Sequence, residues 1–133
     1  MHDWNGTPTS VLFSNDTSQS SHYLGQEDAG NSGWSGYNSV TCTSFFFKRS
    51  TTYSRLDTYY LAPYPDPPYA SYQKREGVAS HELGHFIGLG HSNEEPAVMN
   101  ESNDGETYYS PQEDDECGVN DRYVNSSYPV TCD

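Results

Sequence analysis

The chain has 133 residues, a formal net charge of -13 and only six Lys and Arg residues. This length fits a single domain with a modest core, since 32% of the residues are hydrophobic and the mean hydropathy is -0.89. The acidic balance argues against nucleic-acid binding and against attraction to anionic membranes, because both need a basic surface. No stretch approaches the apolar length of a membrane span, and we expect a monomer.

The N-terminal half predicts short strands joined by loops. After a turn-like Asn5–Pro8, the apolar residues within Thr9–Ser14 predict a short strand. Asn15–Asn38 is rich in Ser, Asn, Gly and Asp, which predicts loops and turns. Ser39–Phe47 and Leu56–Leu61 contain β-branched and aromatic residues, and each predicts a further strand.

A long helix is expected at about Ser71–Gly88. It follows Ala62–Pro68, whose four prolines predict an extended loop because proline fixes φ and lacks an N–H donor. The hydroxyl of Ser71 is suited to cap the helix N-terminus. The larger apolar side chains expected to face the sheet are Val78, Phe86 and Ile87.

This helix carries a candidate metal site. Positions four apart lie on one helix face, so His81 and His85 can present two imidazole nitrogens to one ion. Gly88 accepts the positive φ that ends the helix, and the following turn brings His91 in as a third ligand. Three neutral imidazoles suit zinc, and a fourth position left to water is typical of a catalytic site. Glu82, beside the first ligand, is the candidate general base.

The C-terminal part predicts irregular structure followed by one helix. Asn93–Tyr109 has few periodic apolar residues. Ser110 as N-cap, Pro111 at the first position and Glu113 completing a capping box predict a helix that ends near Tyr123. Strands, a long helix, a loop and a final helix together predict an α+β domain with a small mixed sheet.

The motif HExxHxxGxxH from His81 to His91, continued by Ser92 and followed by Ala97–Asn100, resembles the metzincin zinc endopeptidases. The nearest form is the matrixin-like one, in its small bacterial secreted type. The resemblance implies that Met99 forms a methionine turn beneath the zinc without binding it. One departure separates the chain from the smallest, snapalysin-like members, which carry aspartate where this chain has His91.

The resemblance implies one catalytic domain over residues 1–133, with a small mixed sheet behind the active-site helix. We expect the sheet and loops in 1–70, the active-site helix and third ligand in 71–92, and the methionine turn, C-terminal helix and tail in 93–133. Asp3–Asn5 is similar to the end of the family's N-terminal helix. We therefore expect that helix to be truncated here, with the rest of it and any export signal encoded upstream.

The activity implied by the resemblance is secreted, zinc-dependent endopeptidase activity on proteins or peptides. Water activated by zinc would attack the peptide bond, with Glu82 as general base. The substrate would lie extended along an edge strand within Gly36–Thr43. The S1′ pocket would form between the active-site helix and Asn100–Ser110, where Tyr108 or Tyr109 either lines the pocket or packs on the helix.

The alternatives to this interpretation are a structural zinc site and an inactive binding module, and structural calcium is a possible addition to it. A purely structural zinc site is disfavoured, because no fourth protein ligand is evident. A catalytically inactive, zinc-containing peptide-binding module is the alternative function, and the intact Glu82 argues against it. Structural calcium is implied for the family. The acidic stretches Asn103–Glu106 and Glu113–Glu116 are its candidate ligands, although solvated surface charge is favoured for both.

The chain has three cysteines, Cys42, Cys117 and Cys132, so one has no partner within the chain. A Cys117–Cys132 disulfide would pin the C-terminal tail, and Cys42–Cys132 is the alternative pairing. None of the three has the spacing of a zinc knuckle. Together with the polar, tyrosine-rich composition, these cysteines predict an oxidising, extracellular location.

Overall fold

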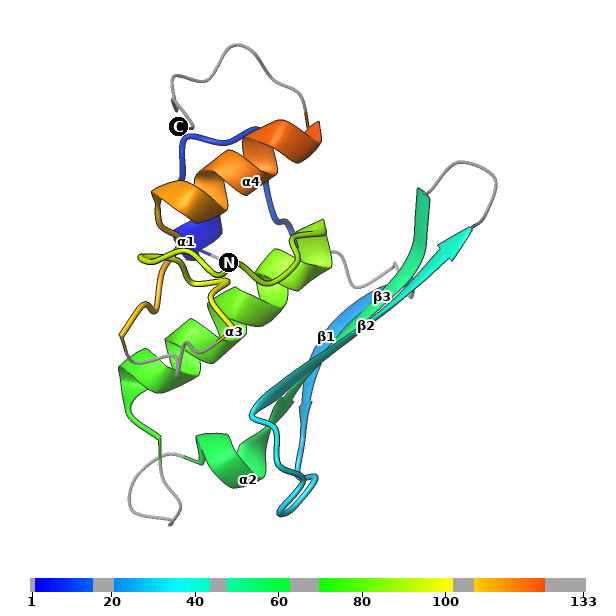
Figure 1. The fold of residues 1–133 in the computed structure, drawn as a ribbon. Coiled ribbons are helices and arrows are strands. Elements are labelled where there is room, and N and C mark those ends of the chain that lie inside the picture. The colour runs from blue at the N-terminus through cyan, green and yellow to red at the C-terminus, as the bar shows by residue number, and fades with distance from the viewer. Residues whose placement is uncertain (1, 16–20, 44–47, 63–69, 102–106, 124–133) are drawn as a thin grey trace.

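The computed structural model describes residues 2–15, 21–43, 48–62, 70–101 and 107–123. A long helix, α3, runs through the middle of the molecule, with a small sheet on one side and helices α1 and α4 on the other (Figure 1). This is the α+β arrangement expected from the sequence. In the described part of the chain, every helix is too short or too polar to traverse a lipid bilayer.

Within the described residues the sheet has three strands, β1 (His22–Glu27), β2 (Gly36–Thr43) and β3 (Lys48–Asp57), in the order β1-β3-β2. Strand β1 runs parallel to β3, and β2 pairs with β3 in the antiparallel sense. The sheet is therefore mixed, as expected. Strand β2 lies at its edge, which confirms the prediction of an edge strand over Gly36–Thr43.

The strand predictions are wrong in three places. Thr9–Ser14 forms no strand, because the Asn5 side chain accepts a hydrogen bond from the Phe13 N–H and donates one to the Phe13 carbonyl. Strand β1 lies inside the segment predicted as loop, where its polar residues hide the strand pattern. Leu56–Leu61 is not one strand.

Strand β3 ends at Asp57, and the short helix α2 (Thr58–Leu61) follows at once. The carboxylate of Asp57 caps this helix by accepting a hydrogen bond from the Tyr59 N–H, which turns the chain out of the sheet. The predicted strand at Ser39–Phe47 corresponds to β2, which begins earlier, at Gly36. Residues 44–47, and the proline-rich 63–69, lie outside the described residues.

Helix α3 spans Tyr72–Ile87 and confirms the predicted long helix. Its N-cap is Ser71, whose side chain accepts a hydrogen bond from the Lys74 N–H at 3.0 Å. Its C-cap is Gly88, which has a φ of 107° and donates to the carbonyls of Gly84 and His85. A β-carbon is strained at this backbone angle, so glycine allows the sharp exit that the motif requires.

The C-terminal helix α4 spans Glu113–Tyr123 and begins later than predicted. Ser110 and Pro111 precede it, so the predicted capping box is wrong. Instead, the carboxylate of Asp115 accepts a hydrogen bond from the Gln112 N–H at 2.8 Å. This bond satisfies one of the backbone donors left over at a helix N-terminus.

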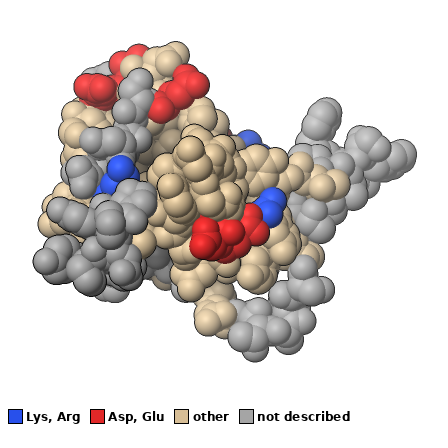
Figure 2. Space-filling view, turned by 90° about the horizontal axis from the view of Figure 1, so that it is seen from below, with Lys and Arg blue, Asp and Glu red and all other residues tan. Residues whose placement is uncertain are grey.

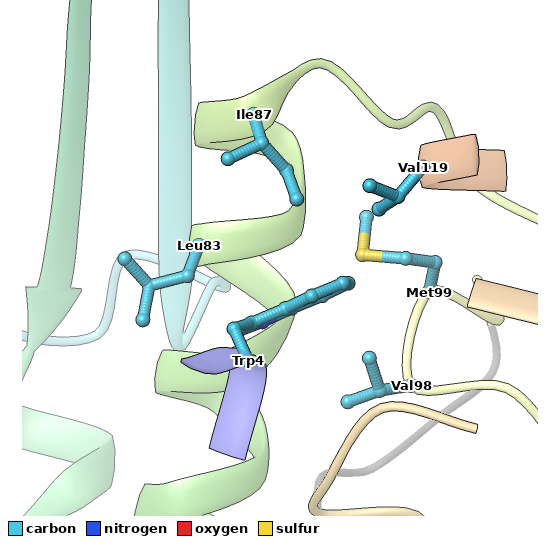
Figure 3. Close-up of a cluster of buried hydrophobic side chains, with 6 residues drawn as sticks. All are labelled: Trp4, Leu83, Ile87, Val98, Met99 and Val119. Carbon is cyan, nitrogen blue, oxygen red and sulfur yellow. The ribbon is translucent and has the colours of Figure 1, made fainter. Parts of the chain in front are cut away.

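The hydrophobic core lies between α3, α4, the short helix α1 (His2–Asn5) and the loop after α3 (Figure 3). Its buried members are Trp4, Leu83, Ile87, Val98, Met99 and Val119. The indole Nε1 of Trp4 donates a hydrogen bond to the Ser80 carbonyl at 2.9 Å, so its polar atom is satisfied. This core supports α3 from the side opposite the sheet, whereas Phe86 packs against His22 of β1.

Candidate metal centre and active site

His81, His85 and His91 converge, as the motif predicts. Each offers a ring nitrogen, and these atoms all lie within 4.8 Å of one another. The Nε2 atoms of His85 and His91 are 3.2 Å apart. Three nitrogens at the usual distance of about 2.1 Å from a tetrahedral zinc ion would lie roughly 3.4 Å from each other. The three imidazoles therefore fit a zinc ion in both chemistry and spacing.

Backbone carbonyls fix the orientation of two of these rings. The Nδ1 atom of His81 lies 2.8 Å from the Val98 carbonyl, and that of His85 lies 3.0 Å from the Leu89 carbonyl. Because a carbonyl oxygen only accepts, each Nδ1 carries the proton and each Nε2 keeps its lone pair. This is the tautomer that metal-binding histidines adopt when a second partner orients the ring.

Burial favours the neutral form of His81. It lowers the pKa of His81 to about 4, and the neighbouring His85 and His91 rings act in the same direction, whereas the hydrogen bond to Val98 opposes them. A metal ligand has to be deprotonated at the binding nitrogen. These surroundings therefore keep the His81 ring uncharged at neutral pH, as metal binding requires.

The methionine turn is held in place from α4. The carboxylate of Asp115 accepts hydrogen bonds from the N–H groups of Val98, at 2.7 Å, and Met99, at 2.9 Å. Burial raises the pKa of Asp115, and these bonds together with the one from Gln112 act in the opposite direction. Met99 itself is 1% exposed. Its sulfur packs so closely on Gly84 that a β-carbon there would lie 2.2 Å from it.

Glu82 is buried at the start of the motif and faces the edge strand. A β-carbon built on Gly36, the first residue of β2, would lie 2.4 Å from the Oε1 atom of Glu82. Its other oxygen, Oε2, has no hydrogen-bond partner among the described residues. Burial raises the pKa of Glu82 to about 7. This carboxyl group is therefore packed against β2, and its second oxygen is buried and unpaired among the described residues.

A cleft of about 570 Å³ opens beside this site. Its walls come from α3 and from the loop before β2, with contributions from the segment after α3. The lining residues are Gly33, Trp34, Ser35, Gly36, Lys74, Gly77, Val78, His81, Glu82, His91 and Glu101. The cleft thus joins two of the three histidines and Glu82 to the edge strand.

A second cavity, of about 730 Å³, lies between the loop after α3 and helix α4. It is lined by several carboxylates, among them Glu94, Glu113 and Asp121. The surface seen from below also shows Asp and Glu gathered into separate groups with few basic side chains between them (Figure 2). These features agree with the net charge of -13. The described residues bring together no group of metal-binding side chains besides the three histidines.

Several sequence predictions about this region stay untested. Neither Tyr108 nor Tyr109 is among the described residues that line the cleft. Of the candidate calcium stretches, Asn103–Glu106 lies outside the described residues and Glu113–Glu116 forms the first turn of α4, so calcium remains a prediction. The cysteine pairing also remains a prediction, because Cys132 lies outside the described residues.

Sequence reasoning missed two groups that shape the site. One is Asp115, whose role depends on a contact with Val98 and Met99 that no local pattern encodes. The other is the loop that leads into Gly36, for which the composition predicted only turns. A glycine at the start of the edge strand was the available signal, since it allows close approach of the backbone.

Comparison with known proteins agrees with this geometry. Neither the curated proteins nor the solved structures contain a significant match to the chain. In contrast, the family model described as matrixin matches residues 14–124, which is most of the 133-residue chain. The matched part contains the three convergent histidines, Glu82 and the methionine turn. The chain therefore belongs to the matrixin family.

Proposed function

We propose that this protein is an endopeptidase that hydrolyses internal peptide bonds of protein or peptide substrates with zinc and a glutamate base. Membership of the matrixin family implies a zinc metallopeptidase. The observation that carries the proposal is the convergence of His81, His85 and His91 next to a buried Glu82 that lines a cleft. A structural zinc site has no need of a cleft or of a neighbouring carboxylate.

The three imidazoles would hold zinc through their Nε2 atoms. In His81 and His85 the Nδ1 proton is held by a backbone carbonyl, which leaves Nε2 as the donor atom. When bound, zinc supplies Lewis acidity, which polarises the scissile carbonyl and makes water a far stronger acid. Since α3 carries two ligands and Glu82, little reorganisation is required during the reaction.

Glu82 is proposed as the group that moves the proton. One of its oxygens packs against Gly36 and the other, Oε2, has no partner among the described residues. This oxygen is buried but belongs to a side chain that lines the cleft, and it is proposed to accept a proton from the attacking water and deliver it to the leaving amine. General acid–base catalysis of this kind typically contributes about 10²- to 10⁴-fold in rate.

The substrate is proposed to bind as an additional strand along β2. Among the described strands, β2 lies at the sheet edge and pairs with β3 alone, so a further chain can add along its outer side. The same strand begins at Gly36, beside Glu82. A peptide paired with β2 would therefore pass the proposed general base and the metal site.

Incubation with casein tests the proposal. Hydrolysis should disappear with a zinc chelator and return when zinc is restored. Stoichiometric zinc binding without cleavage of casein or of a peptide library would instead favour the inactive binding module. Failure to bind zinc at all would exclude both functions.

Glu82→Gln separates the proton-transfer role from metal binding. The substitution keeps the side-chain shape against Gly36, so zinc content and thermal stability should match the wild type, whereas kcat should fall about 100-fold or more. Glu76→Gln is the matched control, because Glu76 lies on the same helix but does not line the cleft. Full activity of Glu82→Gln would show that another group is the base.

A further inference from the structure

The segment 28–35, called the cleft loop below, connects β1 to β2 and forms one wall of the cleft through Gly33, Trp34 and Ser35. It contains no helix or strand of its own. Glycines with positive φ occur at Gly30, 64°, and Gly33, 86°. Its position therefore depends on contacts made by its backbone and side chains with the rest of the fold.

Asp57 provides the first of these contacts. Its side chain is fully buried, at 0% exposure, at the end of β3. Its Oδ1 atom accepts a hydrogen bond from the Ala29 N–H at 3.0 Å, and its Oδ2 atom accepts one from the Ser32 hydroxyl at 2.7 Å. Oδ1 also accepts the Tyr59 N–H at 2.9 Å. One carboxylate thus ties the cleft loop to the junction of β3 and α2.

Tyr60 provides the second contact. Its hydroxyl donates a hydrogen bond to the Asn31 side-chain oxygen at 2.5 Å and accepts one from the Gly33 N–H at 3.1 Å. Both partners lie in the cleft loop, and Gly33 itself lines the cleft. The hydroxyl is therefore bonded on both sides of the turn that presents Trp34.

The cleft loop ends against the proposed general base. Ser35 accepts a backbone hydrogen bond from the Asp57 N–H at 2.9 Å, and the next residue, Gly36, packs on Glu82. Gly36 is also held by its pairing with Leu56 of β3. The sheet therefore fixes the end of the loop at Glu82, while Asp57 and Tyr60 fix the part that carries Trp34.

We propose that Asp57 and Tyr60 are positioning residues that hold the cleft loop as a preformed wall of the substrate cleft. This inference rests on the proposed peptidase function. Neither side chain lines the cleft, so both act through the loop. A preformed wall binds a peptide without first losing the conformational freedom of the loop, and this strengthens substrate binding. We call the hydrogen bonds of Asp57 and Tyr60 to the cleft loop the clamp. Loss of the clamp weakens substrate binding more than it slows the chemical step, because His81 and Glu82 lie on α3 and not on the loop.

Tyr60→Phe is the sharpest test, because it removes only the hydroxyl. Two hydrogen bonds of ordinary strength are lost, so KM for a peptide substrate should rise about three- to tenfold. The value of kcat should stay within about twofold of the wild type, and zinc content should be unchanged. Tyr59→Phe is the matched control: this neighbouring tyrosine packs on Tyr60, and its hydroxyl makes no hydrogen bond among the described residues.

Asp57→Asn provides the second variant, and hydrogen exchange provides a readout that needs no activity. The amide hydrogens of 28–35 should exchange faster in Asp57→Asn and Tyr60→Phe than in the wild type and Tyr59→Phe, while those of α3 stay protected. Equal exchange and equal KM in Tyr60→Phe and Tyr59→Phe would overturn the positioning role. A wild type that binds zinc but cleaves nothing would refute the peptidase function, and the exchange result would still decide whether the clamp holds the loop.

Discussion

The Nδ1 atom of His81 lies 2.8 Å from the carbonyl oxygen of Val98, which joins the first metal ligand to the methionine turn. The backbone N–H of Val98 is fixed as well, because it donates to Asp115 of α4 at 2.7 Å. A continuous set of hydrogen bonds therefore runs from the C-terminal helix through the methionine turn to the metal site. Such outer partners orient the ligands and increase metal affinity.

Asp115→Ala should destabilise the protein and weaken zinc binding together. The substitution leaves the N–H groups of Val98 and Met99 unsatisfied in a buried setting, at a cost of about 2–4 kcal/mol in unfolding free energy. Zinc affinity should also fall, since the Val98 carbonyl would no longer be held against His81. Chemical denaturation and competition with a zinc chelator measure the two effects.

The matched control for this prediction is Asp114→Ala. It removes a neighbouring acidic side chain of α4 that makes no hydrogen bond to the methionine turn. Its stability and zinc affinity should stay close to those of the wild type. Equal effects of the two substitutions would mean that the charge of the helix N-terminus matters and the contact with the turn does not.

Gly84→Ala should lower the melting temperature. A β-carbon at this position would lie 2.2 Å from the Met99 sulfur and 3.2 Å from the Trp4 ring, in the middle of the buried core. Overpacking costs about 1–3 kcal/mol, which outweighs the gain of up to about 1 kcal/mol from replacing glycine in a helix. Gly90→Ala is the control within the same motif, because a β-carbon there meets nothing within 4 Å. An unchanged or higher melting temperature of Gly84→Ala would contradict the observed packing.

The metal site could be predicted from the sequence because its geometry is local. His81 and His85 share a helix face through their spacing alone, and Gly88 ends the helix at the predicted point with a φ of 107°. The caps of α3 also follow from single residues, Ser71 and Gly88. Within this stretch, the conformations that the individual residues favour are the ones that the folded protein adopts.

The contacts that support the site could not be predicted, because they join segments far apart in the chain. Asp57 was placed near the start of a predicted strand, Leu56–Leu61, but its burial and its bonds to Ala29 and Ser32 require β1 and β3 to be placed first. Strand β1 was missed because its two large apolar residues, Tyr23 and Leu24, are adjacent and both exposed, so its sequence shows no alternation of polar and apolar residues. Asp115 was counted only within the acidic stretch Glu113–Glu116, as a candidate calcium ligand or as solvated surface charge.

Zinc removal should lower thermal stability. A ligand that binds only the folded state stabilises it by RT ln(1 + [L]/Kd), so zinc at about 100 times Kd adds about 2.7 kcal/mol. The melting temperature should fall with a chelator and recover with zinc, and His85→Ala should abolish the response. His22→Ala is the control, since this histidine packs on Phe86 outside the triad. A persistent zinc response in His85→Ala would place the metal elsewhere.

Asp57 should make stability depend on pH in the acidic range. Burial raises the pKa of this carboxyl, but the hydrogen bonds from Ser32, Tyr59 and Ala29 outweigh it, so the pKa lies below the ordinary value of 3.8. Because the folded pKa is depressed, the stabilisation is complete above the unfolded pKa and is lost as the pH falls from 3.8 through the folded value. Between pH 5 and about 3, the unfolding free energy of Asp57→Asn should therefore fall less steeply than that of the wild type. Asp28→Asn is the control: it has the same net charge as Asp57→Asn but changes an exposed carboxylate of the cleft loop. If the unfolding free energy of the two variants changed equally steeply with pH, the assigned environment of Asp57 would be contradicted.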